Sequence, residues 1–270
     1  MTITRKNINR WFWITVLLLW LVAPMVPLFI WSFSFRWFYP SVLPTEYSLR
    51  AWEFVFSDRS GVGQALWDTS LIAVAVTFMS ILIGIPAGRA LGMHDFRGKR
   101  AIELLILAPT IVPGLAVALG IHVAFIRYGL SNTLLGVILV HLIPTLPYMT
   151  LVMSGIFANY QPEFEQQARS LGAGPVATLW YVMLPAIMPG VIVGGLFTFL
   201  ISWSQYILTL IIGGGLVQTL PLLLFNFARN DNGFAGALSI VYIFPGVLIL
   251  LLTSRYLTGE DGAVGGIGNI

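Results

Sequence analysis

The polar residues best suited to specific binding lie in one short insert, residues 163–185, which is "EFEQQARSLGAGPVATLWYVMLP". Pro162 suits the first turn of a helix, and Glu163 and Glu165 favour the positively polarised end of that helix. Glu165 and Arg169 have the i, i+4 spacing at which opposite charges stabilise a helix. The insert is therefore expected to begin with a short amphipathic helix.

The apolar side of this helix carries Phe164, Ala168 and Leu171 at the spacing i, i+4 and i+7. Burying Phe164 and Leu171 in the cleft of a partner would contribute about 1.5–3 kcal/mol each. A helix lying on the membrane surface is the alternative, but such helices usually have a basic polar face. Because the first turn here is acidic, the pattern favours docking to a partner protein.

The insert is expected to turn at its glycines. Gly172 and Gly174 should end the first helix, with Gly172 in a backbone conformation that a Cβ would disfavour. Pro175 should then open a second short helix that ends at Pro185. The prediction is two small helices at an angle, neither long enough to span a membrane.

No other stretch has the residues of a catalytic or metal site. The nearest approach to a phosphate-binding loop, "GMHDFRGKR" from Gly92, has five residues between its glycines and no hydroxyl after Lys99. The chain is therefore not expected to hydrolyse ATP. His94, His122 and His141 are not spaced as metal ligands, and no nucleophile elbow occurs. We predict no catalytic residue and no metal ligand, and assign no role to His122 or His141.

The composition is that of a membrane protein. Hydrophobic residues make up 57% of the 270 residues and charged residues 9%, whereas soluble domains contain about 25% charged residues. The net charge of +3 is expected to reflect basic loops on one side of a membrane, not nucleic-acid binding. The absence of cysteine excludes disulfides and thiolate sites.

Six stretches between charged residues are long enough to cross a bilayer as helices, which takes about 20 apolar residues. They cover residues 11–33, 66–88, 102–126, 132–157, 187–212 and 234–256. The first has the basic flank of a signal peptide but is too long for one, so we interpret it as a retained anchor. The expected fold class is an all-α integral membrane protein with six transmembrane helices. It should form one domain over residues 1–270, with a flexible tail over 259–270.

The distribution of Lys and Arg predicts the orientation. With both termini in the cytoplasm, nine of the 14 basic residues face inside and five face outside. Arg89, Arg97, Lys99 and Arg100 then gather in one short inner loop. The insert lies between the fourth and fifth spans, so it is predicted to be cytoplasmic as well.

Several spans carry residues that disturb or tighten helix packing. Pro109 and Pro113 interrupt the third span, which membrane helices tolerate where neighbouring groups satisfy the freed backbone. The pairs Gly84–Gly88 and Gly190–Gly194 have the spacing that lets helices approach closely. Broken helices of this kind are weakly indicative of a transporter or channel.

The spans hold no central carboxylate. Asp68 and Glu103 lie near span ends, whereas a proton- or sodium-coupled carrier usually needs a buried acid. A secondary carrier or channel is therefore a less favoured alternative. A membrane enzyme is disfavoured too, because the chain lacks a polar catalytic cluster.

The insert resembles the cytoplasmic signature of permease subunits of binding-protein-dependent ABC importers. That signature is Glu-Ala-Ala, three residues, Gly, nine residues, Ile-x-Leu-Pro, and residues 166–168, Gly172 and 182–185 keep its spacing. Gln166 and Gln167 replace the usual Glu and first Ala. The residues that the resemblance assigns to coupling are Glu163, Phe164, Glu165, Gln166, Gln167, Ala168, Arg169, Leu171, Gly172, Ala173, Leu184 and Pro185.

The resemblance extends over about residues 65–257 and implies a type I ABC importer permease fold. Residues 158–185 would be the coupling segment, whose helix docks in a groove of a separate ABC ATPase subunit. The implied partners are ATPase subunits that carry ATP and magnesium, a second homologous permease subunit, an extracytoplasmic solute-binding protein and the lipid bilayer. No cofactor is expected in this chain, and the implied location is the bacterial cytoplasmic membrane.

Within the family, the chain is most similar to the spermidine/putrescine-type permeases. The supporting runs are "LGMHDFRGKR", "LAPTIVPGLAVALG", "LGAGPVATLWYVMLPAIMPG" and "TLPLLLFNFAR". A polyamine is therefore the first solute expected, and a neutral or anionic organic solute is the alternative.

The fifth span holds Trp203, Ser204, Gln205 and Tyr206, where polyamine-type permeases commonly carry acidic residues. Removing water from ammonium groups costs several kcal/mol per charge unless carboxylates compensate, and aromatic rings offset about 0.5–2 kcal/mol each. Ser204 and Gln205 are predicted to line the translocation path as neutral hydrogen-bonding groups. Trp203 and Tyr206 either line it or serve packing.

Overall fold

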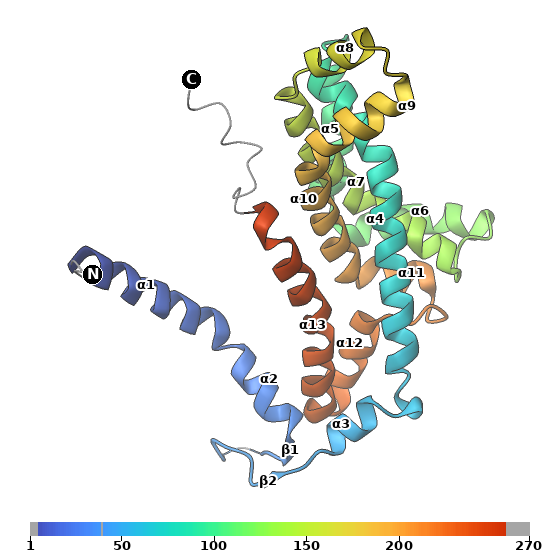
Figure 1. Ribbon diagram of the computed structural model, residues 1–270. Coiled ribbons are helices and arrows are strands. Elements are labelled where there is room, and N and C mark those ends of the chain that lie inside the picture. The colour runs from blue at the N-terminus through green and yellow to red at the C-terminus, as the bar shows by residue number, and fades with distance from the viewer. Residues whose placement is uncertain (1–4, 39, 258–270) are drawn as a thin grey trace. The chain divides into compact units, whose positions relative to one another are not determined.

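A computed structural model of the chain describes residues 5–38 and 40–257, so the tail predicted over 259–270 lies outside the described residues. The described chain is built of helices joined by short turns, with one small hairpin (Figure 1). It divides into two compact units. Unit 1 comprises the described residues up to Ala65 together with Leu222–Pro245, and unit 2 comprises Leu66–Pro221 and the described residues from Gly246 onward.

Unit 1 contains α1 (Arg5–Val22), α2 (Met25–Ser32), β1 (Ser34–Arg36), β2 (Glu46–Tyr47), α3 (Arg50–Val55), the 3₁₀ turn η1 (Asp58–Ser60), most of α12 (Leu220–Asn230) and the first half of α13 (Asn232–Leu257). The strands pair antiparallel. Asp231 accepts a hydrogen bond from the Gly233 N–H at the start of α13 and forms an ion pair with Arg50 at 2.6 Å. At Gly236, a Cβ would lie 2.7 Å from the carbonyl oxygen of Leu28 in α2. Helices α2 and α13 therefore pack backbone to backbone.

The first predicted span, 11–33, is a pair of helices. Helix α1 ends at Val22, α2 begins at Met25, and their axes differ by 45°. Pro24 stands directly before α2, and a proline ring removes a backbone donor and clashes with the preceding turn. The break therefore has a local cause.

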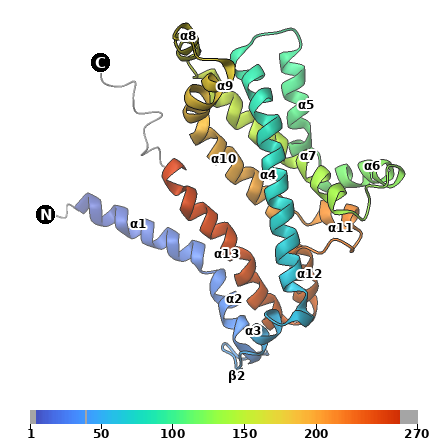
Figure 2. The same cartoon turned by 45° about the vertical axis from the view of Figure 1, so that its right-hand side comes forward.

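Unit 2 contains most of α4 (Val62–Met93), α5 (Lys99–Ile111), α6 (Gly114–Arg127), α7 (Leu134–Ala158), α8 (Glu163–Ser170), α9 (Pro175–Thr178), the π-helical segment η2 (Leu179–Met183), α10 (Leu184–Trp203) and α11 (Ile207–Gly213). Helices α4, α7 and α10 run side by side, and α8 and α9 lie together at one end of them (Figures 1 and 2).

The close helix packing predicted from the glycine spacing is confirmed on both sides of α7. A Cβ on Gly88 of α4 would lie 2.4 Å from the Cβ of Met153, and a Cβ on Gly190 of α10 would lie 2.4 Å from Cγ1 of Ile156. Real side chains do not approach this closely, so glycine is required at both places for the helices to pack.

Four continuous helices in the described residues are long and apolar enough to cross a membrane: α4, α7, Pro175–Trp203 and Asn232–Ser254. They confirm the spans predicted at 66–88, 132–157 and 234–256, and part of the one at 187–212. Two bent helix pairs bring the number of spans to up to six, if each pair is counted as one span. The fold class is therefore the predicted one, an all-α membrane protein.

The third predicted span, 102–126, is not one straight helix. Helix α5 ends at Ile111, α6 begins at Gly114, and their axes differ by 104°. Val112 is extended, with ψ 131°, because the ring of Pro113 disfavours a helical conformation in the residue before it. Pro109 remains inside α5. The position of the break therefore follows from the second proline.

The fifth predicted span, 187–212, ends earlier than predicted. Helix α10 stops at Trp203, and α11 begins at Ile207. The hydroxyl of Ser204 donates to the carbonyl oxygens of Leu200 and Ile201 at 2.9 and 3.3 Å, and such bonds compete with the helical ladder. Helix α12 lies between the fifth and sixth predicted spans.

Candidate functional site

The first helix of the insert is confirmed as α8, which begins directly after Pro162. At its other end, the N–H of Gly172 donates to the carbonyl of Arg169 and the N–H of Ala173 to that of Ala168, both at 3.0 Å. This pair of hydrogen bonds is a Schellman motif, which needs a left-handed residue after the helix. Gly172 supplies it with φ +90°, as predicted.

The second helix of the insert differs from the prediction. It does not end at Pro185 but continues as one helix over Pro175–Trp203. The turn before the proline is π-helical, with the N–H of Leu184 donating to the carbonyl of Leu179. A wider turn of this kind absorbs a residue that would otherwise break the ladder. The predicted coupling segment is therefore one separate short helix, α8, followed by an extension of a spanning helix.

Helix α8 buries one carboxylate, that of Glu165, and leaves its apolar stripe exposed. Glu165 is 6% exposed, whereas Phe164 is 52% and Leu171 is 89% exposed. This is the reverse of an ordinary surface helix, whose apolar stripe faces its own protein. The exposed stripe is consistent with the predicted docking surface.

Glu165 is held by Arg89, which lies near the end of α4. The guanidinium Nη2 of Arg89 donates to both carboxylate oxygens of Glu165 at 3.0 Å. Its Nη1 lies 2.8 Å from the sulfur of Met183, and the guanidinium sits 5.9 Å from the ring centre of Phe157. The predicted i, i+4 partner, Arg169, is farther from Glu165, at 3.7 Å, and exposed.

Tyr160 lies beside this ion pair. Burial, together with the negative charge of Glu165, raises the pKa of Tyr160 to about 12, although Arg89 opposes the shift. The phenol is therefore neutral at any physiological pH. It is a polar but uncharged neighbour of the ion pair.

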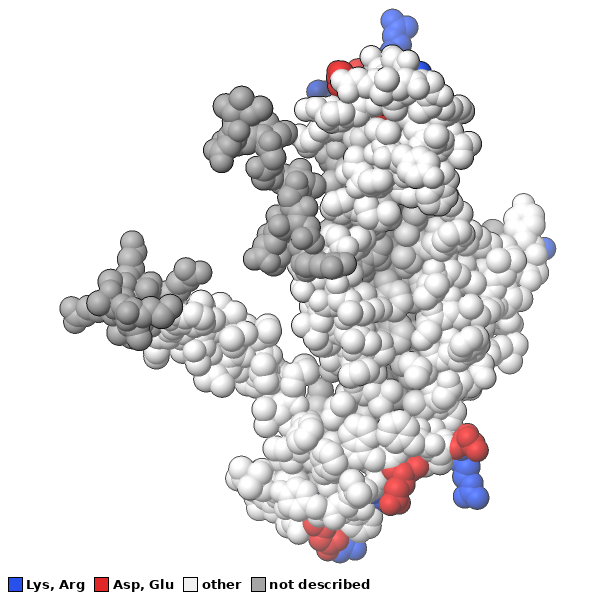
Figure 3. Space-filling view, in the orientation of Figure 1, with Lys and Arg blue, Asp and Glu red and all other residues white. Residues whose placement is uncertain are grey.

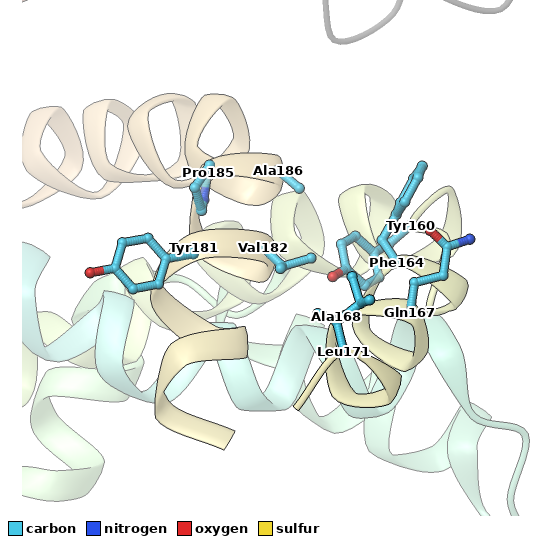
Figure 4. A pocket seen from close by; sticks show the side chains of 9 residues that line it. All are labelled: Tyr160, Phe164, Gln167, Ala168, Leu171, Tyr181, Val182, Pro185 and Ala186. Carbon is cyan, nitrogen blue, oxygen red and sulfur yellow. The ribbon is translucent and has the colours of Figure 1, made fainter. Parts of the chain in front are cut away.

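A groove of about 570 Å³ runs along the exposed side of α8. Two segments of the chain line the groove from opposite sides (Figure 4). One side carries Tyr160, Phe164, Gln167, Ala168 and Leu171, and the other carries Tyr181, Val182, Pro185 and Ala186. On the face in Figure 3, charged side chains gather over the α8 end of unit 2, and the helix flank next to it carries none. The groove is thus lined by uncharged, mostly apolar side chains, at the end of unit 2 where charged side chains gather.

The predicted coupling residues fall into three classes of exposure. The exposed ones are Glu163, Phe164, Gln166, Gln167, Arg169, Leu171, Gly172 and Pro185. Ala168, Ala173 and Leu184 are partly buried, and Glu165 is buried. All but the buried carboxylate therefore present atoms to a partner.

The four predicted path residues surround the break between α10 and α11. Trp203 is buried and stacks on Phe199 at 5.5 Å, which indicates a packing role. Ser204 is exposed, while Gln205 and Tyr206 are partly buried. The break therefore presents Ser204 fully and Gln205 in part.

His141, to which the sequence assigns no role, connects the helices on either side of this break. The residue is 1% exposed in α7, with Nδ1 3.0 Å from the hydroxyl of Ser202 in α10 and Nε2 2.9 Å from that of Thr209 in α11. Both ring nitrogens are occupied, one as donor and one as acceptor. Two helix segments on either side of the break are thus tied to a third helix.

His122 is different, because its buried Nδ1 in α6 has no hydrogen-bond partner among the described residues. Within the described part of the chain, no three His, Cys, Asp or Glu side chains are grouped to hold a metal ion.

Arg89 is the site residue that sequence analysis missed. It was counted only as a basic residue of an inner loop, but it lies inside α4, four residues before the helix ends. A charge inside a spanning helix needs a partner, so its position was the available signal. Its partner, 76 residues away, has no sequence signature.

Comparisons with known proteins agree with this architecture. The molybdenum transport system permease protein ModB of Mycobacterium tuberculosis is 29% identical over 228 residues, covering 78% of this chain and 86% of that protein. The spermidine/putrescine transport system permease protein PotC of Haemophilus influenzae is 25% identical over 214 residues, covering 77% of this chain and 83% of that protein. Relatives of both kinds thus match at similar levels.

A crystal structure of a bacterial ABC transporter involved in the import of the acidic polysaccharide alginate has the same fold. Its TM-score is 0.71 at 18% identity, covering 95% of this chain and 99% of that chain. The family model described as "Binding-protein-dependent transport system inner membrane component" matches residues 80–258, well over half of the chain. The chain belongs to this family, the permeases of ABC importers.

Proposed function

We propose that this permease is driven by a separate ABC ATPase subunit that docks on α8 and on the groove beside it. The observation that carries the proposal is the outward apolar stripe of α8, with Leu171 89% exposed beside a groove of about 570 Å³. ATP and magnesium would be bound by that ATPase subunit. A second homologous permease and an extracytoplasmic solute-binding protein complete the proposed importer.

The energetics of docking support this choice. Burying a fully exposed leucine or phenylalanine contributes about 1.5–3 kcal/mol, and Phe164 and Leu171 stand together on one face of α8. Apolar anchors flanked by polar groups are typical of the centre of a protein interface. The polar neighbours here are Gln167 and Tyr160.

The experiment is co-purification of the ATPase subunit with Leu171→Glu permease. We expect the variant to reach the membrane in normal amount but to lose the ATPase subunit, because a carboxylate would be buried in the interface. Leu43→Glu is the matched control, since Leu43 is 59% exposed outside this segment. Retention of the ATPase subunit by Leu171→Glu at the level of the control would refute the proposed docking.

The orientation belongs to the same proposal. The α8 end and both termini are proposed to face the cytoplasm of a bacterial cell, which the Lys and Arg distribution favours. In this cysteine-free chain, Cys introduced at position 97 or 170 should resist a membrane-impermeant thiol reagent applied to intact cells. Labelling from outside would reverse the assignment.

For the solute, we propose a small neutral or anionic molecule, with Ser204 and Gln205 lining its path. Among the described residues, the only buried carboxylate is Glu165, which is already paired with Arg89. Buried groups near the break are hydroxyls and an imidazole, and these do not offset the desolvation of a polycation. The similarity to ModB is in keeping with an anion, such as molybdate.

A polyamine is the second candidate, because similarity to PotC favours it. The partner permease would then have to supply the missing carboxylates. Uptake of molybdate and of putrescine by Gln205→Ala and Gln205→Lys permeases separates the two. An anion should tolerate the lysine better than the alanine, whereas a polycation should be excluded by like charge. Unchanged uptake in both variants would remove Gln205 from the path.

A further inference from the structure

The guanidinium of Arg89 joins α4 to three other segments of unit 2. It donates to both carboxylate oxygens of Glu165 in α8 at 3.0 Å, contacts the sulfur of Met183 in η2 at 2.8 Å, and lies over the ring of Phe157 in α7. We propose that Arg89 is a positioning residue through which displacement of α8 is passed to the spanning helices. The inference rests on the proposed docking of an ATPase subunit at α8.

The ion pair between Arg89 and Glu165 attaches α8 to the rest of unit 2. The apolar side chains Phe164 and Leu171 face outward, so they cannot hold α8 against the bundle. The side chain of Glu165 is 8% exposed and that of Arg89 34%, so water screens this pair less than a surface pair. The second cation near the carboxylate, Arg169, is 62% exposed and 3.7 Å away, and it is on α8 itself.

The position of Arg89 suits transmission to the bundle. The preceding residue, Gly88, packs against α7 so closely that a Cβ would lie 2.4 Å from Met153. The next glycine of α4 on this face, Gly92, would place a Cβ 2.5 Å from the carbonyl oxygen of Ser154. A displacement applied at Arg89 therefore meets two helices in backbone contact, which must move together because closely packed interiors do not deform continuously.

The geometry of the ion pair explains why a polar contact is suited to passing a displacement of α8 to the spanning helices. Nη2 of Arg89 contacts both carboxylate oxygens while Nη1 contacts the sulfur of Met183. These directional contacts together fix the orientation of the guanidinium as well as its distance, whereas an apolar face permits sliding. The surrounding groups, Tyr160 and Met183, are uncharged. Within the described residues near the carboxylate, the charges are thus those of Glu165, Arg89 and Arg169.

The test uses spin labels in the cysteine-free chain. Ser170→Cys places one label on exposed α8, and Val74→Cys places another on α4, at a site that is 59% exposed. Val74 lies about 22 Å along the helix from Arg89, from 15 residues at 1.5 Å each. Pulsed electron resonance then measures the distribution of distances between α8 and α4 in the full-length permease, alone and with its ATPase subunit.

We expect a narrow distribution in the otherwise unchanged permease and a broad one in Arg89→Ala and in Glu165→Ala. The reciprocal exchange Arg89→Glu with Glu165→Arg should restore much of the narrow distribution, and Arg89→Lys should be intermediate. Arg97→Ala is the matched control, because Arg97 is exposed just beyond α4, and it should leave the distribution narrow. A narrow distribution in Arg89→Ala would overturn the proposal without the ATPase subunit being involved.

Coupling between α8 and the spanning helices is measured in the complex of the permease with its ATPase subunit. In Arg89→Ala, we expect the ATPase subunit to remain bound, while trapping of ADP with vanadate after ATP hydrolysis moves α8 relative to α4. With Arg89 present, the two labels should keep their distance in both nucleotide states. Uptake of molybdate or putrescine per ATP hydrolysed should fall on the order of tenfold in Arg89→Ala. A nucleotide-dependent change of equal size with and without Arg89 would overturn the coupling role, whereas loss of the ATPase subunit from the unchanged permease would instead contradict the proposed function.

Discussion

Replacing Gly172 with alanine tests the turn that ends α8, and the same turn provides its own control. Gly172 has φ +90°, and Gly174, two residues later, has φ −71° and ψ 169°. A Cβ at either glycine would meet no heavy atom within 4 Å. The two substitutions therefore add the same atom in open space, and they differ in whether the backbone conformation suits an L residue.

The expected magnitude follows from that difference. A left-handed conformation costs an L residue about 1–2 kcal/mol, while the extended conformation at Gly174 is accessible to any residue. Gly172→Ala should therefore lower the population of the Schellman turn, and with it the presentation of α8, by about 5- to 30-fold. Gly174→Ala should have little effect. Gly172→Val should be worse than Gly172→Ala because a β-branched residue is stiffer.

The assay is the affinity of the ATPase subunit for purified permease variants in detergent, measured by titration. We expect weaker binding by Gly172→Ala and nearly unchanged binding by Gly174→Ala, with equal amounts of both permeases in the membrane. Affinity unchanged from that of the unsubstituted permease in both variants would show that the left-handed turn does not determine docking. Equal and severe loss in both would show that the partner occupies the open space beside the glycines.

Three other predictions concern packing, the helix break and pH. Gly88→Ala should destabilise the permease by about 1–3 kcal/mol, because its Cβ would lie 2.4 Å from Met153. Gly120→Ala is the control, since its Cβ meets no atom within 4 Å and should not destabilise the protein. Thermal unfolding in detergent compares the two variants. His141→Phe should cost about 1–3 kcal/mol through the loss of two interhelical hydrogen bonds, and an unchanged melting temperature would contradict this. Because the pKa of Tyr160 is raised from 10.0 to about 12, the folded state keeps a proton that the unfolded state loses, so the free energy of unfolding should fall between pH 10 and 12. Tyr160→Phe should flatten that fall, and an identical pH profile would count against the shift.

Much of the fold could be predicted because its determinants are local. Long apolar runs between charges identify the spans, since a bilayer admits only segments that satisfy their own backbone. The glycine pairs of α4 and α10 predicted close packing for a similar reason, because small residues at a spacing of four lie on one face of a helix. The positive φ of Gly172 was predicted from its place after the amphipathic run.

The places where the spans end were harder to predict. Pro113 was visible as an interruption, but the 104° between α5 and α6 depends on how the next helix packs. The end of α10 at Trp203 has even less signal, because serine hydroxyls bond to helical carbonyls in many helices without ending them. In the insert, Pro185 was expected to end a helix that instead continues through a π turn.

The sequence by itself determined the class of protein, the approximate positions of its spans, and the amphipathic insert with its apolar stripe. Only the tertiary structure decided that Glu165 of α8 is buried, that Arg89 meets it from 76 residues away, and that His141 meets partners 61 and 68 residues away. Periodicity reports which residues share a face of a helix, but it carries no information about what packs against that face. Ion pairs and buried hydrogen bonds depend on the contact between faces, so they exist only once the helices have packed.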